Sequence, residues 1–174
     1  MTNDSPERYG SISKIFHWGM AILLVWQGMK FFDRINDGEH WVGQTLVPFH
    51  VGIGSLLLLL VVLRIVWALK QRGNRPVQNP ATAALVAIGH FLLYAGMVLL
   101  PVTGVMYLVG NGYGWKPFGI QLIAGGPEIP WMASLGGALH SPVAWLLLIM
   151  VVGHIGIALV HQFVKKDGVL NRML

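Results

Sequence analysis

The stretch 139-LHSPVAWLLLIMVVGHIGIALVHQFV-164 decides the fold, because it is long, almost wholly apolar and carries three histidines. A helix that crosses the hydrocarbon core of a bilayer needs about 20 such residues. His140, His154 and His161 follow one another at intervals of 14 and 7 residues, which leaves all three on one helix face at about 100° per residue. The first two are then roughly 21 Å apart along the axis. Two imidazoles at two depths on one face predict two separate metal sites stacked across a membrane.

The composition places the chain among membrane proteins. Of its 174 residues, 55% are hydrophobic and only 11% are charged, and the mean hydropathy is +0.62, which excludes an ordinary soluble domain. The absence of cysteine excludes disulfides, thiolate-bound iron–sulfur clusters and covalently attached haem. Any haem must therefore be of the b type, held by axial ligands and packing alone.

Four apolar spans predict an all-α, integral-membrane four-helix bundle. Each is close to the length that a helix needs to cross a bilayer, and no alternating pattern supports a β-barrel. The expected helices are Ile15–Phe32, Val47–Leu69, Ala81–Val109 and Leu139–Val164. No internal repeat or domain boundary is evident, so residues 1–174 are expected to form a single transmembrane domain.

Basic residues near the ends of the spans set the expected orientation. Eight of them fall on one side: Arg8, Lys14, Lys70, Arg72, Arg75, Lys165, Lys166 and Arg172. Only Lys30, Arg34 and Lys116 fall on the other. Both termini are therefore expected to be cytoplasmic, with the polar N-terminus as a short lead into the first helix. The net charge of +5 reflects this topology rather than a nucleic-acid partner.

Depth along the spans pairs four of the seven histidines. His17 and His154 match on the cytoplasmic side, and His50 and His140 match on the outer side. Six-coordinate haem iron requires one imidazole from each of two facing helices. A lone membrane histidine is more often a hydrogen-bonded packing residue, but two depth-matched pairs favour two bis-histidine b-type haems. A bundle without haem, whose histidines only pack, is the alternative.

Arg64 places a charge inside the second span. It follows His50 by 14 residues, so it shares that helix face and lies at the depth of the inner pair. Such a charge costs about 2.5 kcal/mol or more and needs a partner. No Asp or Glu lies within any span, and a haem propionate would serve. The alternative is an Arg64 side chain that extends to the cytoplasmic surface.

Two polar features and one loop lie outside these pairs. His161, near the cytoplasmic end of the fourth span, is interpreted as a residue that exchanges protons with a bound quinone, or else as a solvated helix-end histidine. His90 and Tyr94 are spaced four residues apart and are no more than a candidate polar pair. The Gly-rich segment 110–137 is expected to cap the outer mouth of the bundle or to form an interfacial loop.

The sequence resembles the bacterial cytochrome b561 family along nearly its whole length. The matching residues are Arg8-Tyr9, His17-Trp18, His50, Gly54, Arg64, His90, Tyr94, Pro101, Gly104, Phe118-Gly119, His140, His154, His161 and the tail 166–173. The resemblance implies a four-helix inner-membrane protein in which His17 and His154 hold one b haem while His50 and His140 hold the other. It also implies electron transfer from periplasmic superoxide to ubiquinone near His161.

Pro142 departs from the family pattern, two residues after His140. Because proline suits only the first turn of a helix, His140 is expected at the very start of the fourth helix.

The histidine pairs predict a di-haem cytochrome, and the family resemblance implies the superoxide:quinone oxidoreductase (superoxide oxidase) type. Its expected partners are membrane lipid, ubiquinone, and superoxide or a periplasmic redox protein; a homo-oligomer is compatible with the sequence. Lys30, Arg34 and Lys116 would attract an anion to the outer haem, but several acidic residues oppose them: Asp33, Asp37, Glu39 and Glu128. The alternative is a non-catalytic b subunit that carries electrons for a peripheral dehydrogenase or hydrogenase.

Overall fold

The computed structural model describes residues 2–33, 35–77 and 79–174, and the regular elements in these ranges are helical apart from one isolated bridge between Trp115 and Ile123. Its four long helices are α1 (Ser11–Gly28), α3 (His50–Lys70), α4 (Ala83–Gly110) and α5 (Pro130–Val160). Each of these four, with its flanking turns, is long and apolar enough to span a membrane. The predicted all-α fold with four spans is confirmed.

Shorter helical turns extend or join the long helices. α1 continues as the 3-10 turn Met29–Phe32, and α5 continues as the π turn His161–Lys165. The short helix α2 (Trp41–Thr45) lies before α3 and was not predicted, because one turn is too short to show a hydrophobic period. The remaining 3-10 turns are Ile35–Gly38, Val47–Phe49, Arg72–Asn74, Pro117–Gly119 and Leu170–Arg172.

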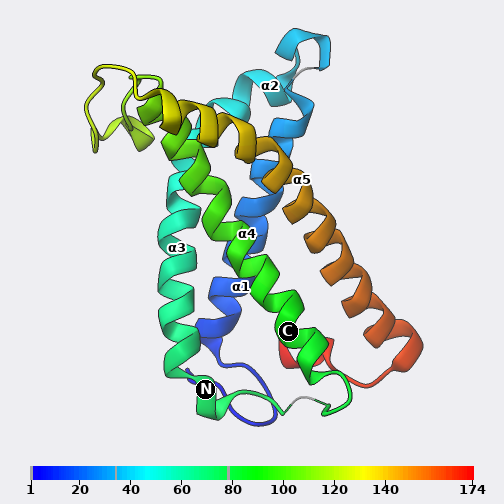
Figure 1. Ribbon diagram of the computed structural model, residues 1–174. Helices are drawn as coiled ribbons and strands as arrows, with labels where there is room; N and C mark the ends of the chain where they lie inside the picture. The colour runs from blue at the N-terminus through cyan, green and yellow to red at the C-terminus, as the bar shows by residue number, and fades with distance from the viewer. Residues whose placement is uncertain (1, 34, 78) are drawn as a thin grey trace.

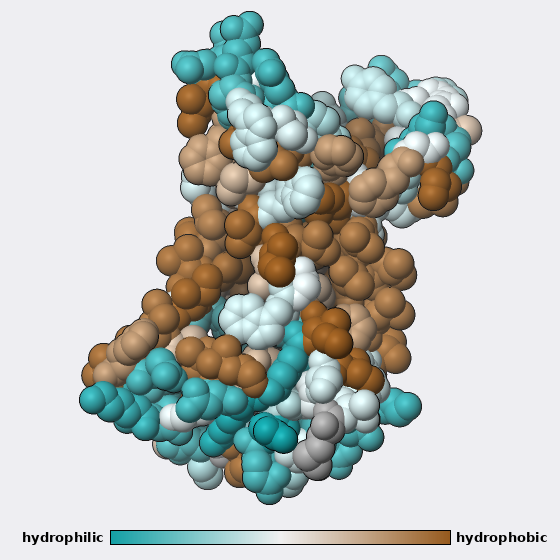
Figure 2. Space-filling view, turned by 180° about the vertical axis from the view of Figure 1, so that it is seen from behind, coloured by the Kyte–Doolittle hydropathy of each residue, from teal (hydrophilic) through white to brown (hydrophobic). Residues whose placement is uncertain are grey.

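The long helices pack side by side in the order α1, α3, α4 and α5, with the most extensive contact between α4 and α5. α1 packs against α3, α4 packs along α5, and α3 also contacts α4, whereas the backbone of α5 stays farther from α1 and α3 over the described residues (Figure 1). The main buried cluster lies between α1 and α3, where Met20 and Val61 are almost wholly inaccessible. Many other apolar side chains face outward, and on the face drawn in Figure 2 they form a mainly apolar band between two polar ends. Such a surface suits a protein surrounded by lipid.

α5 is longer and less regular than expected. It begins at Pro130 rather than Leu139, with the proline in the first turn, where its missing N–H is not needed. Pro142 lies inside the helix, so the expectation that His140 begins the helix was wrong. Pro142 cannot donate to the carbonyl of Ala138, and α5 bends near this point: its first turns cross one end of the bundle before it runs down beside α4 (Figure 1).

The connection from α4 to α5 packs against α3. Trp115 Nε1 donates a hydrogen bond to Ser55 Oγ, at 3.0 Å, and the Phe118 ring covers Gly52, where a Cβ would lie only 2.6 Å from that ring. The loop therefore lies beside the bundle, and the first turns of α5, rather than the loop, cross its end (Figure 1). The predicted cap segment 110–137 thus contributes in both ways: Trp115 and Phe118 pack against α3, whereas residues 130–137 are the first turns of α5.

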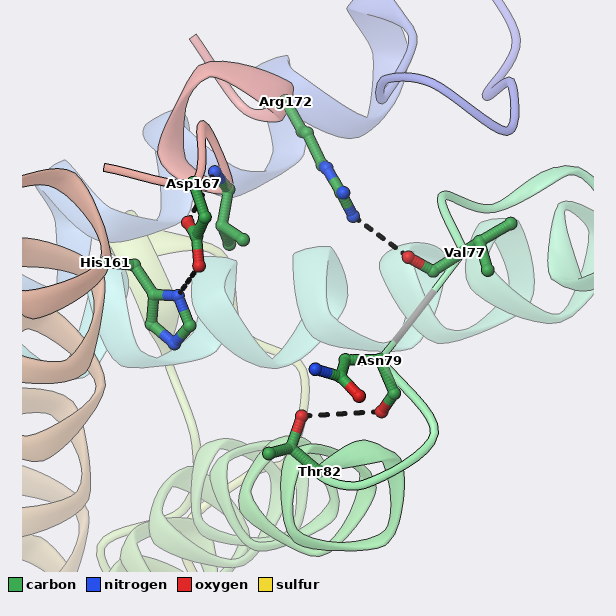
Figure 3. Close-up of polar contacts among 7 residues, drawn as sticks. Val77, Asn79, Thr82, His161, Asp167 and Arg172 are labelled. Atoms are coloured by element: carbon green, nitrogen blue, oxygen red, sulfur yellow. Dashed lines mark hydrogen bonds and ion pairs between the residues drawn. The ribbon is translucent and has the colours of Figure 1, made fainter. Parts of the chain in front are cut away.

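Both termini lie at the opposite end of the bundle and are hydrogen-bonded together (Figure 1). The amide of Tyr9 donates to the carbonyl of Arg172 at 3.0 Å, and Trp18 Nε1 donates to the carbonyl of Met173 at 3.0 Å. The Arg172 side chain in turn donates to the carbonyl of Val77, in the α3–α4 connection, at 3.0 Å (Figure 3). Which side of the membrane this end faces stays a prediction.

A buried carboxylate anchors the N-terminal segment. Asp4 is only 6% exposed, and its Oδ1 accepts hydrogen bonds from Gly10 N at 2.9 Å and from Ser13 Oγ at 2.6 Å. Trp67 of α3 donates to the same Ser13 hydroxyl at 2.8 Å. The N-terminal lead into α1 is therefore a packed part of the bundle end.

Candidate functional site

Two pairs of imidazoles bridge the wider separation between α5 and the α1–α3 pair. The outer pair consists of His50, at the first residue of α3, and His140 of α5, whose ring centroids are 6.1 Å apart. The inner pair consists of His17 of α1 and His154 of α5, with ring centroids also 6.1 Å apart. Two metal–nitrogen bonds of about 2 Å, each continued by about 1 Å to the ring centroid, place two axial imidazoles roughly 6 Å apart. Both spacings fit one iron atom between two rings.

Thr103 of α4 determines which nitrogen of His140 carries the proton. Its Oγ1 donates to the carbonyl of Leu100 at 2.8 Å, so the same oxygen accepts from His140 Nδ1 at 3.2 Å. The neutral ring then keeps a lone pair on Nε2, which an axial ligand requires. Gly104 allows this close approach, because a Cβ there would lie 3.0 Å from His140 Cε1.

His50 and Gln27 each bring a buried polar atom that the described residues leave unpaired. Gln27 of α1 donates through Nε2 to the backbone carbonyl of His50 at 2.9 Å, while Gln27 Oε1 and His50 Nδ1 have no partner. Buried polar atoms are rarely left unsatisfied in a finished site. A rotation that pairs Nδ1–H with Oε1 would orient His50 for metal binding through Nε2. These residues therefore fit an axial ligand and its supporting acceptor.

A third imidazole lies beside the inner pair. The ring centroid of His90, on α4, is 5.7 Å from that of His154, and His90 Nδ1 donates to the carbonyl of Val86 at 2.9 Å. This hydrogen bond leaves a lone pair on Nε2, so the Nε2 atom of His90 could also bind a metal ion. The two members of the candidate His90–Tyr94 pair have other partners in the structure: His90 donates to the carbonyl of Val86, and the Tyr94 hydroxyl accepts from Arg64.

Arg64 points into the bundle beside the inner pair. Its Nε donates to Tyr94 Oη at 3.1 Å, and one terminal nitrogen lies 3.2 Å from His17 Nδ1. The guanidinium has only donors, so in this arrangement His17 Nδ1 must accept. An imidazole bound to metal through Nε2 carries its proton on Nδ1. Arg64 must therefore leave His17 Nδ1 when that ring binds iron, and its guanidinium is then free for a carboxylate.

The carboxylate of Asp167 holds His161 at the end of the bundle that the sequence predicts to be cytoplasmic. The Nδ1 atom of His161 lies 2.5 Å from Asp167 Oδ2, and Asp167 Oδ1 accepts from the amide of Val169 at 3.2 Å (Figure 3). The hydrogen bond from His161 lowers the pKa of Asp167 below its ordinary value of 3.8. The pair is exposed at the end of α5, so it is compatible with both descriptions of His161, the proton-exchanging residue and the solvated helix-end histidine.

Thr103, Gln27 and Asp167 were not identified from the sequence as site residues. Thr103 and Gln27 meet the histidines only through helix packing, which carries no local signal. Asp167 lies six residues beyond His161 in the tail, and this proximity was the one available sign.

The outer cations form a weaker anion-attracting surface than their number suggests. Lys30 is bound to Asp33, and the hydrogen bond from Lys30 lowers the pKa of that carboxyl group. Asp33 therefore stays charged and offsets Lys30. Arg34 lies outside the described residues.

The helix arrangement and the histidine geometry agree with a comparison against known families. The model of the family described as prokaryotic cytochrome b561 matches residues 8–174. The chain belongs to this cytochrome b561 family. It is 31% identical to "Cytochrome b561 homolog 2" of Escherichia coli (strain K12), over 98% of this chain and 93% of the relative.

Two more distant relatives of this b561-family protein are also matched almost end to end. "Probable superoxide oxidase CybB" of Yersinia pestis is 24% identical, over 97% of this chain and 96% of the relative. "Cytochrome b562" of Cereibacter sphaeroides is 26% identical, over 95% and 94%. Family membership makes this chain a multi-pass membrane protein of electron transfer that binds b-type haem.

Proposed function

We propose that this b561-family protein is a di-haem cytochrome that transfers electrons across the bacterial inner membrane, from periplasmic superoxide to ubiquinone. The observation that carries the proposal is the presence of two imidazole pairs of equal spacing along one helix, α5. His140 and His154 are 14 residues apart, which corresponds to roughly 21 Å of helix within a hydrocarbon core of about 30 Å. Two sites at these depths would connect the two faces of the membrane.

Each pair would hold one haem through its Nε2 atoms. His50 and His140 are the proposed outer ligands, and His17 and His154 are the proposed inner ligands. When bound, the two haem irons supply the one-electron chemistry of the protein. The family resemblance favours His17 over His90 as the partner of His154.

The surrounding side chains orient these ligands. Thr103 accepts a hydrogen bond from His140 Nδ1–H. Gln27, which donates to the His50 carbonyl, also carries an unpaired Oε1 that would accept a hydrogen bond from His50 Nδ1–H after a rotation. Arg64, once it leaves His17, would bind a propionate of the inner haem, which neutralises a charge inside the membrane span. These three residues adjust protonation and charge without binding the iron.

The His161–Asp167 pair would transfer protons on the acceptor side. Asp167 accepts the hydrogen bond from His161 Nδ1–H and holds the ring, so that Nε2 could take up a proton from the aqueous side and then give it to a quinone oxygen. Two superoxide ions would each lose one electron and become dioxygen, and one ubiquinone would take both electrons and two protons. Superoxide as donor is supported by the similarity to a relative named as a probable superoxide oxidase.

The test uses the purified full chain in liposomes that contain ubiquinone, with superoxide generated outside. We expect superoxide-dependent quinol formation without any added subunit. His161→Gln should keep haem reduction by superoxide but lower the rate of quinone reduction by about 10²-fold or more. Quinone reduction that requires a co-purified soluble subunit would refute the proposal and support the alternative of a b subunit for a dehydrogenase or hydrogenase.

A further inference from the structure

A groove of about 650 Å³ lies between α3 and α4, toward the end of the bundle that holds the termini. Apolar side chains of both helices form its walls. Among them Leu69 is 65% exposed, Phe91 is 69% exposed and Leu99 is 50% exposed. The groove is therefore open to the surroundings of the protein, which for membrane-spanning helices is the hydrocarbon of the lipid.

Two arginines line the same groove where α3 ends. Arg72 and Arg75 both contribute to it, and neither pairs with a carboxylate among the described residues. The Nε atom of Arg75 is buried and has no hydrogen-bond partner in that part of the chain. A buried guanidinium donor without an acceptor is costly, and an anionic ligand would satisfy it. The groove thus combines apolar walls with an unpaired cationic end.

We propose that this groove binds one anionic phospholipid, with an acyl chain against the α3–α4 wall and the phosphate at Arg72 and Arg75. The apolar span of α3 ends at Lys70, so both arginines lie just beyond it, at the level of lipid headgroups. One guanidinium group can donate two parallel hydrogen bonds to two oxygens of a phosphate. Basic pockets between membrane helices bind anionic lipid headgroups. A zwitterionic lipid or a quinone would fill the same apolar walls but would leave the cationic end without a net counter-charge.

The groove also reaches the neighbourhood of the inner imidazoles. Tyr94 lines it, and the Tyr94 hydroxyl accepts the hydrogen bond from Arg64. Lipid binding is nevertheless measured without reference to haem or turnover, so its outcome is independent of the proposed function.

The test is native mass spectrometry of the full chain, purified in mild detergent and titrated with phosphatidylglycerol or phosphatidylcholine of identical acyl chains. We expect one phosphatidylglycerol to be retained at concentrations where phosphatidylcholine is not. The double variant R72Q/R75Q should weaken this binding about tenfold or more. The matched control K165Q/K166Q removes two cations from the same end but outside the groove, and should bind as the wild type does.

A second variant tests the apolar wall while the arginines stay in place. Ala95 lines the groove, and Ala95→Phe should fill part of it and lower phosphatidylglycerol retention, with the helical circular dichroism unchanged. Equal retention of the two lipids would overturn the proposal. So would an R72Q/R75Q variant that binds like the wild type, a control variant that loses as much binding, or a groove that retains ubiquinone in place of the anionic lipid.

Discussion

The hydrogen bond between Thr103 and His140 gives a sharp test of the outer haem site. Thr103 is only 3% exposed, and its hydroxyl is the acceptor for His140 Nδ1 at 3.2 Å. Thr103→Val keeps the shape of the side chain but removes the oxygen, so the Nδ1–H of a metal-bound His140 would be buried without an acceptor. Such a loss costs about 1–3 kcal/mol. At about 1.4 kcal/mol per tenfold change, outer-haem affinity should fall roughly 5- to 150-fold, in line with typical effects of a ligand's supporting residue.

The assay compares haem retention and redox titration of wild type, Thr103→Val and Thr103→Ser in the same detergent. We expect Thr103→Val to lose outer haem on dilution and to shift the midpoint potential of what remains, while the inner haem titrates as in the wild type. Thr103→Ser restores the hydroxyl and should restore both properties. Equal haem affinity and potential in Thr103→Val and wild type would refute the assignment of Thr103 as the acceptor for an axial ligand.

Three further predictions concern the ligands of the inner site, the stability of the bundle end and the pH dependence of stability. His90→Ala should keep both haems if His17 and His154 are the inner ligands; loss of the inner haem from the folded variant would identify His90 as a ligand. Asp4→Ala leaves the donors of Gly10 and Ser13 unpaired and should lower the free energy of unfolding by about 1–3 kcal/mol, as followed by thermal unfolding in detergent; an unchanged midpoint would contradict the role of this carboxylate. The hydrogen bond from His161 lowers the pKa of Asp167 below 3.8. The ionised Asp167 therefore stabilises the fold at pH values above 3.8, and this stabilisation is lost as the pH falls through the lowered pKa of the folded state. The difference in stability between wild type and Asp167→Asn should therefore shrink at acidic pH, and a difference that grows there would contradict the sign.

The spans and the histidine pairing were accessible from the sequence because they depend on local geometry. Apolar length predicts where a helix crosses the membrane, and a fixed rise per residue assigns a depth to each histidine. These two rules are enough to predict the separation of His140 and His154 along one helix. The structure accordingly brings His17 near His154 and His50 near His140, with equal centroid spacings.

The details around each ring were not accessible, because they arise where helices pack against one another. Contacts of His140 with Thr103 and of His154 with His90 depend on the register of α4 against α5. The sequence does not predict the start of α5 at Pro130, because the apolar run that defines this span begins at Leu139. Pro142 bends the helix rather than marking its first turn, as a proline inside a long membrane helix can do.

The central claim is that α5 supplies one axial ligand to each of two independent b haems. The most direct test measures the haem content of purified wild type, His140→Ala and His154→Ala. Each protein is examined by the α-band absorption of its chemically reduced haem and by the low-spin electron paramagnetic resonance signal of its oxidised haem. We predict two bis-histidine haems per wild-type chain, with the outer one missing from His140→Ala and the inner one missing from His154→Ala. A wild-type chain with a single haem, or a folded single variant that loses both, would contradict the account.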